Sequence, residues 1–127
     1  MKKVLLAILL VVVFGGPAHA DALDAFLDNL NVKAVADSDG FAIQLSSYFG
    51  VPGTEVDLVI SSVIQPADAF VVLQLGKWTG LPVNQVLEEY HTSRGHGWGV
   101  LAKNLGIKPG SPEFHQLKNG DFDFAMP

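Results

Sequence analysis

Five stretches of the chain repeat the spacing of an amphipathic helix. Apolar residues recur at i, i+3, i+4 and i+7, which places them on one face of an α-helix. Full matches begin at Leu23, Val56, Val83 and Trp98, and a shorter stripe begins at Phe41. Residues 69–75 are almost all apolar, which favours a helix buried on most sides; a strand is the alternative, but no second strand candidate could pair with it.

The connections between these stretches also repeat. Residues 43–52 (IQLSSYFGVP) align without gaps with residues 73–82 (LQLGKWTGLP), and residues 101–109 (LAKNLGIKP) form a degenerate third copy. Each copy has a glycine that can end a helix in the left-handed conformation, then an apolar residue, then a proline that prevents the helix from continuing. We predict an all-α, compact bundle of about six or seven short helices built from helix–Gly–apolar–Pro–helix units.

Residues typical of helix starts support this reading. Asp37, Ser38 or Asp39 can cap the helix that carries Phe41. Pro66 suits the first position of the apolar helix that follows it. Ser111, Pro112 and Glu113 supply a cap, a first-position proline and a first-turn acid for a last short helix.

The first 20 residues have the layout of a secretory signal peptide. Lys2 and Lys3 precede an unbroken apolar run over residues 4–14, and a Gly-Gly-Pro break leads to Ala18-His19-Ala20. We expect cleavage after Ala20. The apolar run would rise only about 16 Å as a helix, against a hydrocarbon core of about 30 Å. We therefore expect no membrane span after cleavage.

The chain then divides into a helical domain, residues 21–118, and a C-terminal tail, residues 119–127. The tail alternates acidic and aromatic residues, and we expect it to be loose, as termini often are. The sequence has no cysteine, so an exported domain would depend on packing alone. This favours a secreted protein in the periplasm or on the extracellular surface of a bacterium.

Charge is divided unevenly along the chain. Without Lys2 and Lys3, 6 basic residues face 13 acidic ones, a net charge of −7, and residues 21–70 carry all of that excess. Residues 91–118 are basic instead and include His91, His96 and His115. This stretch predicts a face for a protein, a polymer or an anionic ligand, although a solvated surface is the simpler interpretation. Export and the acidic net charge argue against nucleic acid.

The most distinctive run is Arg94-Gly95-His96-Gly97-Trp98-Gly99. Alternating glycines disfavour a helix, so we expect a loop with Trp98 at the start of the next helix. Trp98 could stack on a ligand or belong to the core. The candidate binding residues follow: His91, Arg94, His96, Trp98, Lys103 and Lys108.

A metal site is the alternative hypothesis. Glu88 and His91 form one Glu-x-x-His pair, and a loop could bring His96 and His115 near it to bind zinc or copper. The serines lack a Gly-x-Ser-x-Gly context. We therefore predict no catalytic residue and, outside the metal hypothesis, no cofactor.

The segment from Gly95 to Lys118 (GHGWGVLAKNLGIKPGSPEFHQLK) resembles the C-terminal signature of small exported bacterial proteins of unassigned function. The earlier Gly-Val-Pro and Pro-Ala-Asp segments extend this resemblance to about half of the chain that follows residue 20. The resemblance implies export and a helical fold, and it implies no activity or catalytic residue. The sequence thus favours an exported, non-enzymatic binding or interaction domain, with a divalent-metal-binding protein or metal-assisted enzyme as the alternative.

Overall fold

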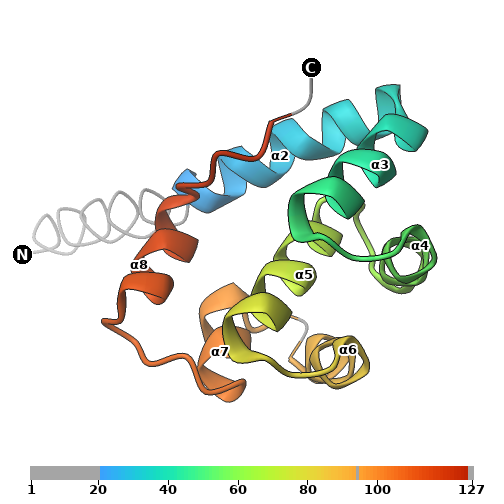
Figure 1. Cartoon of the computed structure of the whole chain (residues 1–127). Coiled ribbons are helices and arrows are strands. Elements are labelled where there is room, and N and C mark those ends of the chain that lie inside the picture. The colour runs from blue at the N-terminus through green and yellow to red at the C-terminus, as the bar shows by residue number, and fades with distance from the viewer. Residues whose placement is uncertain (1–20, 94, 126–127) are drawn as a thin grey trace, which may run out of the picture.

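The computed structural model describes residues 21–93 and 95–125. This part of the chain forms seven α-helices and no strand, so the prediction of an all-α bundle is confirmed (Figure 1). The helices are α2 (Asp21–Ala36), α3 (Ser38–Phe49), α4 (Gly53–Ser62), α5 (Asp68–Thr79), α6 (Val83–Thr92), α7 (Trp98–Asn104) and α8 (Pro112–Asn119). The expected signal peptide, its cleavage site and Arg94 lie outside the described residues.

Helix α5 is the centre of the fold. Every residue from Ala69 to Leu75 is buried, and the helix packs against α3, α4 and α6 (Figure 1). A helix can be apolar on all sides only where neighbours cover all its sides. The prediction of a buried helix here is therefore confirmed, and the strand alternative is wrong.

The repeated turn has the same geometry in its first two copies. Gly50 and Gly80 both adopt the left-handed conformation, with φ of 66° and 73°. Pro52 and Pro82 follow with nearly equal backbone angles, φ −61° and ψ 148° against φ −60° and ψ 146°. In Figure 1, α4 and α6 are both seen end-on while α3 and α5 run across the view. The α3–α4 and α5–α6 pairs are thus two copies of one helix–turn–helix unit.

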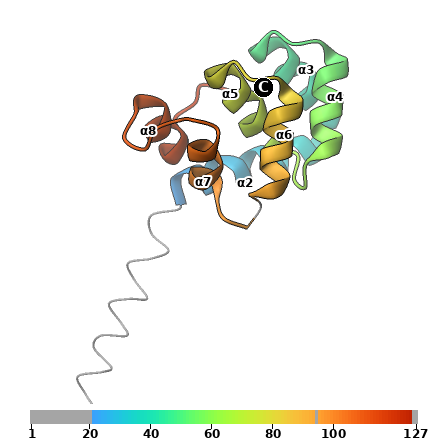
Figure 2. The same ribbon diagram turned by 90° about the horizontal axis from the view of Figure 1, so that it is seen from below.

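The third copy departs from this geometry. Helix α7 ends at Asn104, Gly106 has a φ of 101°, and Pro109 lies before a further turn that leads to Pro112. The connection to α8 is therefore longer than the other two. Seen from below, α7 lies between α6 and α8 (Figure 2), and α8 packs against α2.

Side-chain caps fix two of the helix starts. The Asp37 carboxylate accepts a hydrogen bond from the Gly40 amide at 3.0 Å, so Asp37 is the cap of α3. The Ser111 hydroxyl accepts from the Phe114 amide at 3.2 Å, and Pro112 is the first residue of α8 as expected.

The expected start of α5 at Pro66 is wrong, because the helix begins at Asp68. The amide of Ala67 donates a hydrogen bond of 2.8 Å to the Asn31 side chain on α2. The Asp68 amide bonds to the Gln65 carbonyl at 2.9 Å, in a tight turn ahead of the helix. The Asn31 side chain thus accepts from an amide just ahead of the helix and joins this turn to α2.

The expectation of a loose tail is wrong for residues 121–125. Phe124 is buried with 6% of its surface exposed, and the rings of Phe122 and Phe124 lie 5.0 and 5.2 Å from that of Phe70. The Tyr48 hydroxyl also donates to the Asp123 carboxylate at 3.0 Å. The tail runs along α2 in Figure 1, because burying two aromatic rings outweighs the entropy of a free end.

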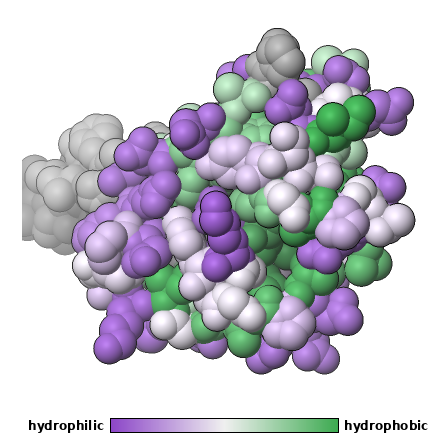
Figure 3. All heavy atoms as spheres, viewed as in Figure 1, coloured by the Kyte–Doolittle hydropathy of each residue, from purple (hydrophilic) through white to green (hydrophobic). Residues whose placement is uncertain are grey.

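In Figure 3, hydrophilic residues lie around much of the edge of the visible face, and hydrophobic residues show nearer its centre and at parts of its edge. Within residues 21–93 and 95–125, no helix combines the length and apolar character needed to cross a bilayer.

Candidate functional site

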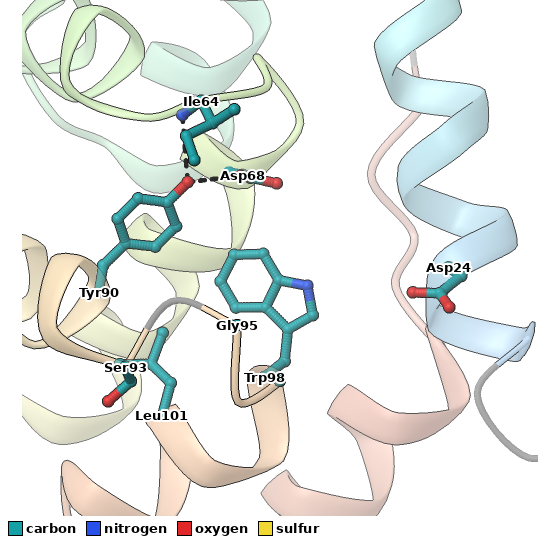
Figure 4. A pocket seen from close by; sticks show the side chains of 9 residues that line it. Asp24, Ile64, Asp68, Tyr90, Ser93, Gly95, Trp98 and Leu101 are labelled. Atoms are coloured by element: carbon teal, nitrogen blue, oxygen red, sulfur yellow. Dashed lines mark hydrogen bonds between the residues drawn. The ribbon is translucent and has the colours of Figure 1, made fainter.

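A cavity of about 400 Å³ opens where α2, α5, α6 and α7 approach one another (Figure 4). It is called the Trp98 cavity below. Its described lining residues are Asp24, Ile64, Asp68, Tyr90, Ser93, Gly95, Gly97, Trp98 and Leu101. This volume lies within the range of small-molecule sites, and apolar walls with a few polar groups are typical of such sites.

Trp98 enters the cavity because of the residue that precedes it. Gly97 has a φ of 96°, a conformation that side-chain-bearing residues rarely adopt, and this turn starts α7 at Trp98. The indole centre lies 5.9 Å from that of Tyr90, with 32° between the ring planes. Leu101, one turn further along α7, is buried behind it. Trp98 is therefore both part of the packed face of α7 and a wall of the cavity.

A hydrogen-bonded group joins α6 to the start of α5. The Tyr90 hydroxyl donates to the Asp68 carboxylate at 2.6 Å and accepts from the Ile64 amide at 3.1 Å, as Figure 4 shows. Burial raises the pKa of Asp68, and the hydrogen bonds from Tyr90 and from the backbone oppose that rise in part. A half-buried carboxylate therefore stands in the cavity, held by a tyrosine.

Asp24 supplies a second carboxylate from α2. Its side chain is exposed, and in Figure 4 it stands across the Trp98 indole from Tyr90. No lysine, arginine or histidine is found among the described lining residues. The described wall of this cavity is therefore aromatic, apolar and acidic.

A second hydrogen-bonded group positions α7. Ser93 is buried at the end of α6, and its hydroxyl donates to the Glu89 carboxylate at 2.7 Å. The Asn104 amide, at the far end of α7, donates to the same carboxylate at 3.0 Å. These bonds hold the start of the α6–α7 connection and the C-terminal end of α7 to one carboxylate on α6, and Gly97 and Trp98 lie between these two points.

A polar cleft of about 550 Å³ lies on the other side of this group. It is lined by Leu81, Gln85, Glu88, Glu89, Thr92, Asn104 and Leu105. It is larger than the Trp98 cavity but holds no aromatic side chain, and its Glu89 and Asn104 already bond to each other. We therefore regard the Trp98 cavity as the better candidate site.

Of the predicted binding residues that the structure describes, only Trp98 lines this cavity, while Arg94 lies outside the described residues. His91, His96, Lys103 and Lys108 are exposed and do not line it. Lys108 borders a different groove, beside Trp78. The histidines and lysines named here are thus exposed outside the cavity and are not gathered within it.

The residues of the metal hypothesis are on separate elements. Glu88 and His91 lie on α6, His96 lies in the α6–α7 connection and His115 lies on α8, all exposed. Within the described ranges, no three His, Cys, Asp or Glu side chains are grouped so that they could hold a metal ion. Zinc or copper binding by this set stays a prediction without support from the geometry.

Sequence reasoning missed Asp24 and Asp68 as site residues. Asp24 occupies a polar position of α2 and Asp68 lies in the first turn of α5, and neither position by itself indicates a site. Tyr90 ends the apolar stripe that begins at Val83, and its side chain is buried, as that stripe predicts. The apolar spacing within one segment does not indicate which helix packs against it. The sequence therefore could not predict that residues of α2, α5 and α7 line the same cavity.

No family model matches the sequence, and neither a curated protein nor a solved structure is similar to the chain. The case for a function therefore rests on the residues and their geometry.

Proposed function

We propose that this chain is an exported helical binding domain that takes a small ligand in the Trp98 cavity without transforming it. The observation that carries the proposal is the cavity itself. Two aromatic rings and two carboxylates from four different segments surround a space of about 400 Å³. A preformed concave site of this kind is the usual place for a ligand.

The polar side chains of the cavity support binding as its role. The Tyr90 hydroxyl is engaged between Asp68 and the Ile64 amide, and the Ser93 hydroxyl is engaged with Glu89. Side chains that are hydrogen-bonded to one another in this way contribute to the shape and the charge of a pocket.

Export is the second part of the proposal, and it rests on residues 1–20. Expression of the full chain in a Gram-negative bacterium, followed by mass measurement of the periplasmic fraction, tests it. We expect a product that begins at Asp21. A product that keeps Met1 and stays in the cytoplasm would contradict export and leave the binding proposal intact.

Binding is tested by a fragment screen on residues 21–127, followed by two-dimensional NMR. We expect the fragments that bind to shift the Trp98 indole and the Gly95 and Gly97 amides. Trp78 lies on α5 outside the cavity and is the internal control, since its indole should not shift. Fragments that shift only other regions would show that the site lies elsewhere.

A further inference from the structure

We propose that the aromatic cluster beneath the C-terminal tail is a docking surface for the tail of a second copy of this chain, so that two copies exchange tails and form a dimer. The aromatic cluster consists of residues of α2, α3 and α5: Phe26, Phe41, Tyr48, Phe70 and Trp78. These residues do not line the Trp98 cavity, so the inference is independent of the proposed ligand.

The tail has two aromatic anchors, and Phe122 is the first. Its ring centre lies 5.4 Å from that of Phe26, 5.0 Å from that of Phe70 and 6.0 Å from that of Trp78. Ring pairs at such distances contribute to binding beyond the area that they bury. Phe122 therefore docks on α2 and α5 together, which agrees with the course of the tail along α2 in Figure 1.

Phe124 is the second anchor, and its side chain is buried. Its ring centre lies 6.3 Å from that of Phe41 and 5.2 Å from those of Tyr48 and Phe70. Between the two anchors, the Asp123 carboxylate accepts a hydrogen bond of 3.0 Å from the Tyr48 hydroxyl. The cluster thus fits a defined pattern, in which one acid stands between two phenylalanines.

The aromatic cluster is assembled by contacts that do not involve the tail. Helix α3 packs against both α2 and α5. The Phe70 ring centre lies 5.2 Å from that of Phe26 and 5.8 Å from that of Tyr48. The surface that receives a tail is therefore formed by the helices themselves, and a preformed surface loses less entropy on binding than a disordered one.

Side chains hold the tail beyond its first two residues. The amides of Asp121 and Phe122 donate to the carbonyls of Gln116 and Gly120, at 3.2 and 3.1 Å. Within residues 21–93 and 95–125, the backbone groups of residues 123–125 have no hydrogen-bond partner. The contacts that dock residues 122–124 on the cluster therefore come from their own side chains, and the tail of a second copy brings the same side chains.

Exchange conserves these contacts. A tail that leaves its own cluster exposes apolar rings, which is unfavourable, but in an exchanged dimer both clusters are covered again. The remaining costs are those of association and of a new chain path at Gly120, which has a φ of 60° and, as a glycine, adopts other conformations easily. A linked tail has an effective concentration in the millimolar range, so exchange should compete as the chain concentration approaches about 1 mM.

A spin label on one chain and an isotope label on the other test the exchange. The sequence contains no cysteine, so an Ala125→Cys chain carries a nitroxide only at this exposed tail position. It is mixed with isotope-labelled native chain, both as residues 21–127, and the two are unfolded in urea and refolded together at about 1 mM. Only the native chain is observed by NMR, so selective broadening of its amides comes from a neighbouring copy.

We expect the native amides near Phe41 and Tyr48 on α3 to be broadened at least about threefold more than those of α6, which lies apart from the tail in Figure 1. Light scattering of the native chain, refolded in the same way, should show a dimer.

Further variants of the nitroxide chain locate the contact. Adding Phe124→Ala removes the second anchor, and the broadening on α3 should fall at least about fivefold. Adding Asp121→Ala is the matched control, since Asp121 is exposed in the same tail and should leave the broadening unchanged. A nitroxide on Asp57→Cys instead, at an exposed position of α4, shows which amides random collisions broaden. The observed chain is native in every mixture, so its fold does not depend on these variants.

The outcomes are distinct. Broadening centred on α3, together with a dimer, supports tail exchange. Broadening that matches the Asp57 label would show unspecific association and would overturn the inference. A dimer without broadening on α3 would show that two copies meet at another surface, and a monomer alone would show that each cluster holds only its own tail. Both of these results overturn the inference, and neither bears on ligand binding in the Trp98 cavity.

Discussion

The hydroxyl of Tyr90, at the end of α6, donates a hydrogen bond of 2.6 Å to the carboxylate of Asp68 in the first turn of α5. The same oxygen accepts the Ile64 amide at 3.1 Å, so one side chain joins α6 to the chain that connects α4 with α5. This contact also forms one wall of the Trp98 cavity. A change at Tyr90 or Asp68 should therefore affect both the stability of the fold and the wall of the cavity.

Tyr90→Phe should lower the free energy of unfolding by about 1–3 kcal/mol, since it leaves the Ile64 amide and a half-buried carboxylate without this partner. Urea unfolding measures the change. Tyr48→Phe is the matched control, because its hydroxyl bonds to the exposed Asp123 and should be worth about 1 kcal/mol or less. Equal losses in the two variants would show that the Tyr90 group has no special role.

Asp68→Asn should alter how stability depends on pH. Burial raises the pKa of Asp68 in the folded chain, so the folded state favours its protonated form. The stability that this group contributes is full below its ordinary pKa of 3.8 and is lost as pH rises through the raised value. The unfolding free energy of the native chain minus that of the variant should therefore fall as the pH is increased from below 3.8 through the raised pKa. A difference that does not change over this range would contradict the raised pKa.

Gly120→Ala should be more destabilising than Gly50→Ala. Both glycines are left-handed, with φ of 60° and 66°, so alanine pays a similar backbone cost of about 1–2 kcal/mol at each. A Cβ at Gly120 would also lie 2.8 Å from the Ala22 carbonyl oxygen on α2, whereas Gly50 has open space around it. We expect Gly120→Ala to cost at least about 1 kcal/mol more in thermal or urea unfolding. Equal costs would mean that α8 does not approach α2 this closely.

Phe124→Ala should cost about 3–5 kcal/mol, since its ring is buried and lies beside those of Phe41, Tyr48 and Phe70. Asp121→Ala, in the same tail but exposed, should change stability by less than about 0.5 kcal/mol. Hydrogen exchange of the tail amides is a second measurement. A Phe124→Ala variant as stable as the native chain would restore the expectation of a loose tail.

The helices and their turns follow from local sequence because their causes are local. The apolar stripes at Leu23, Val56, Val83 and Trp98 each become the buried or half-buried face of a helix. Gly50-Val51-Pro52 and its later copy each end one helix and start the next, since a left-handed glycine and a proline act on their own backbone.

The candidate site and the tail did not follow from local sequence. The tail pattern of acids and aromatics reads equally well as free or packed, and only the position of Phe70 decides that Phe122 and Phe124 are covered. Likewise, the basic composition of residues 91–118 predicted a face for a protein, a polymer or an anionic ligand, whereas the carboxylates among the described lining residues, Asp24 and Asp68, come from other helices.

The sequence by itself determined an all-α chain, the central place of residues 69–75 and the repeated helix–turn–helix unit. These features depend on periodicity, glycine and proline, which act over a few residues. The tertiary structure alone decided that Asp24, Asp68, Tyr90 and Trp98 surround one cavity. The physical reason is that helix packing joins segments through shape and burial, and neither is encoded in the spacing within any one segment.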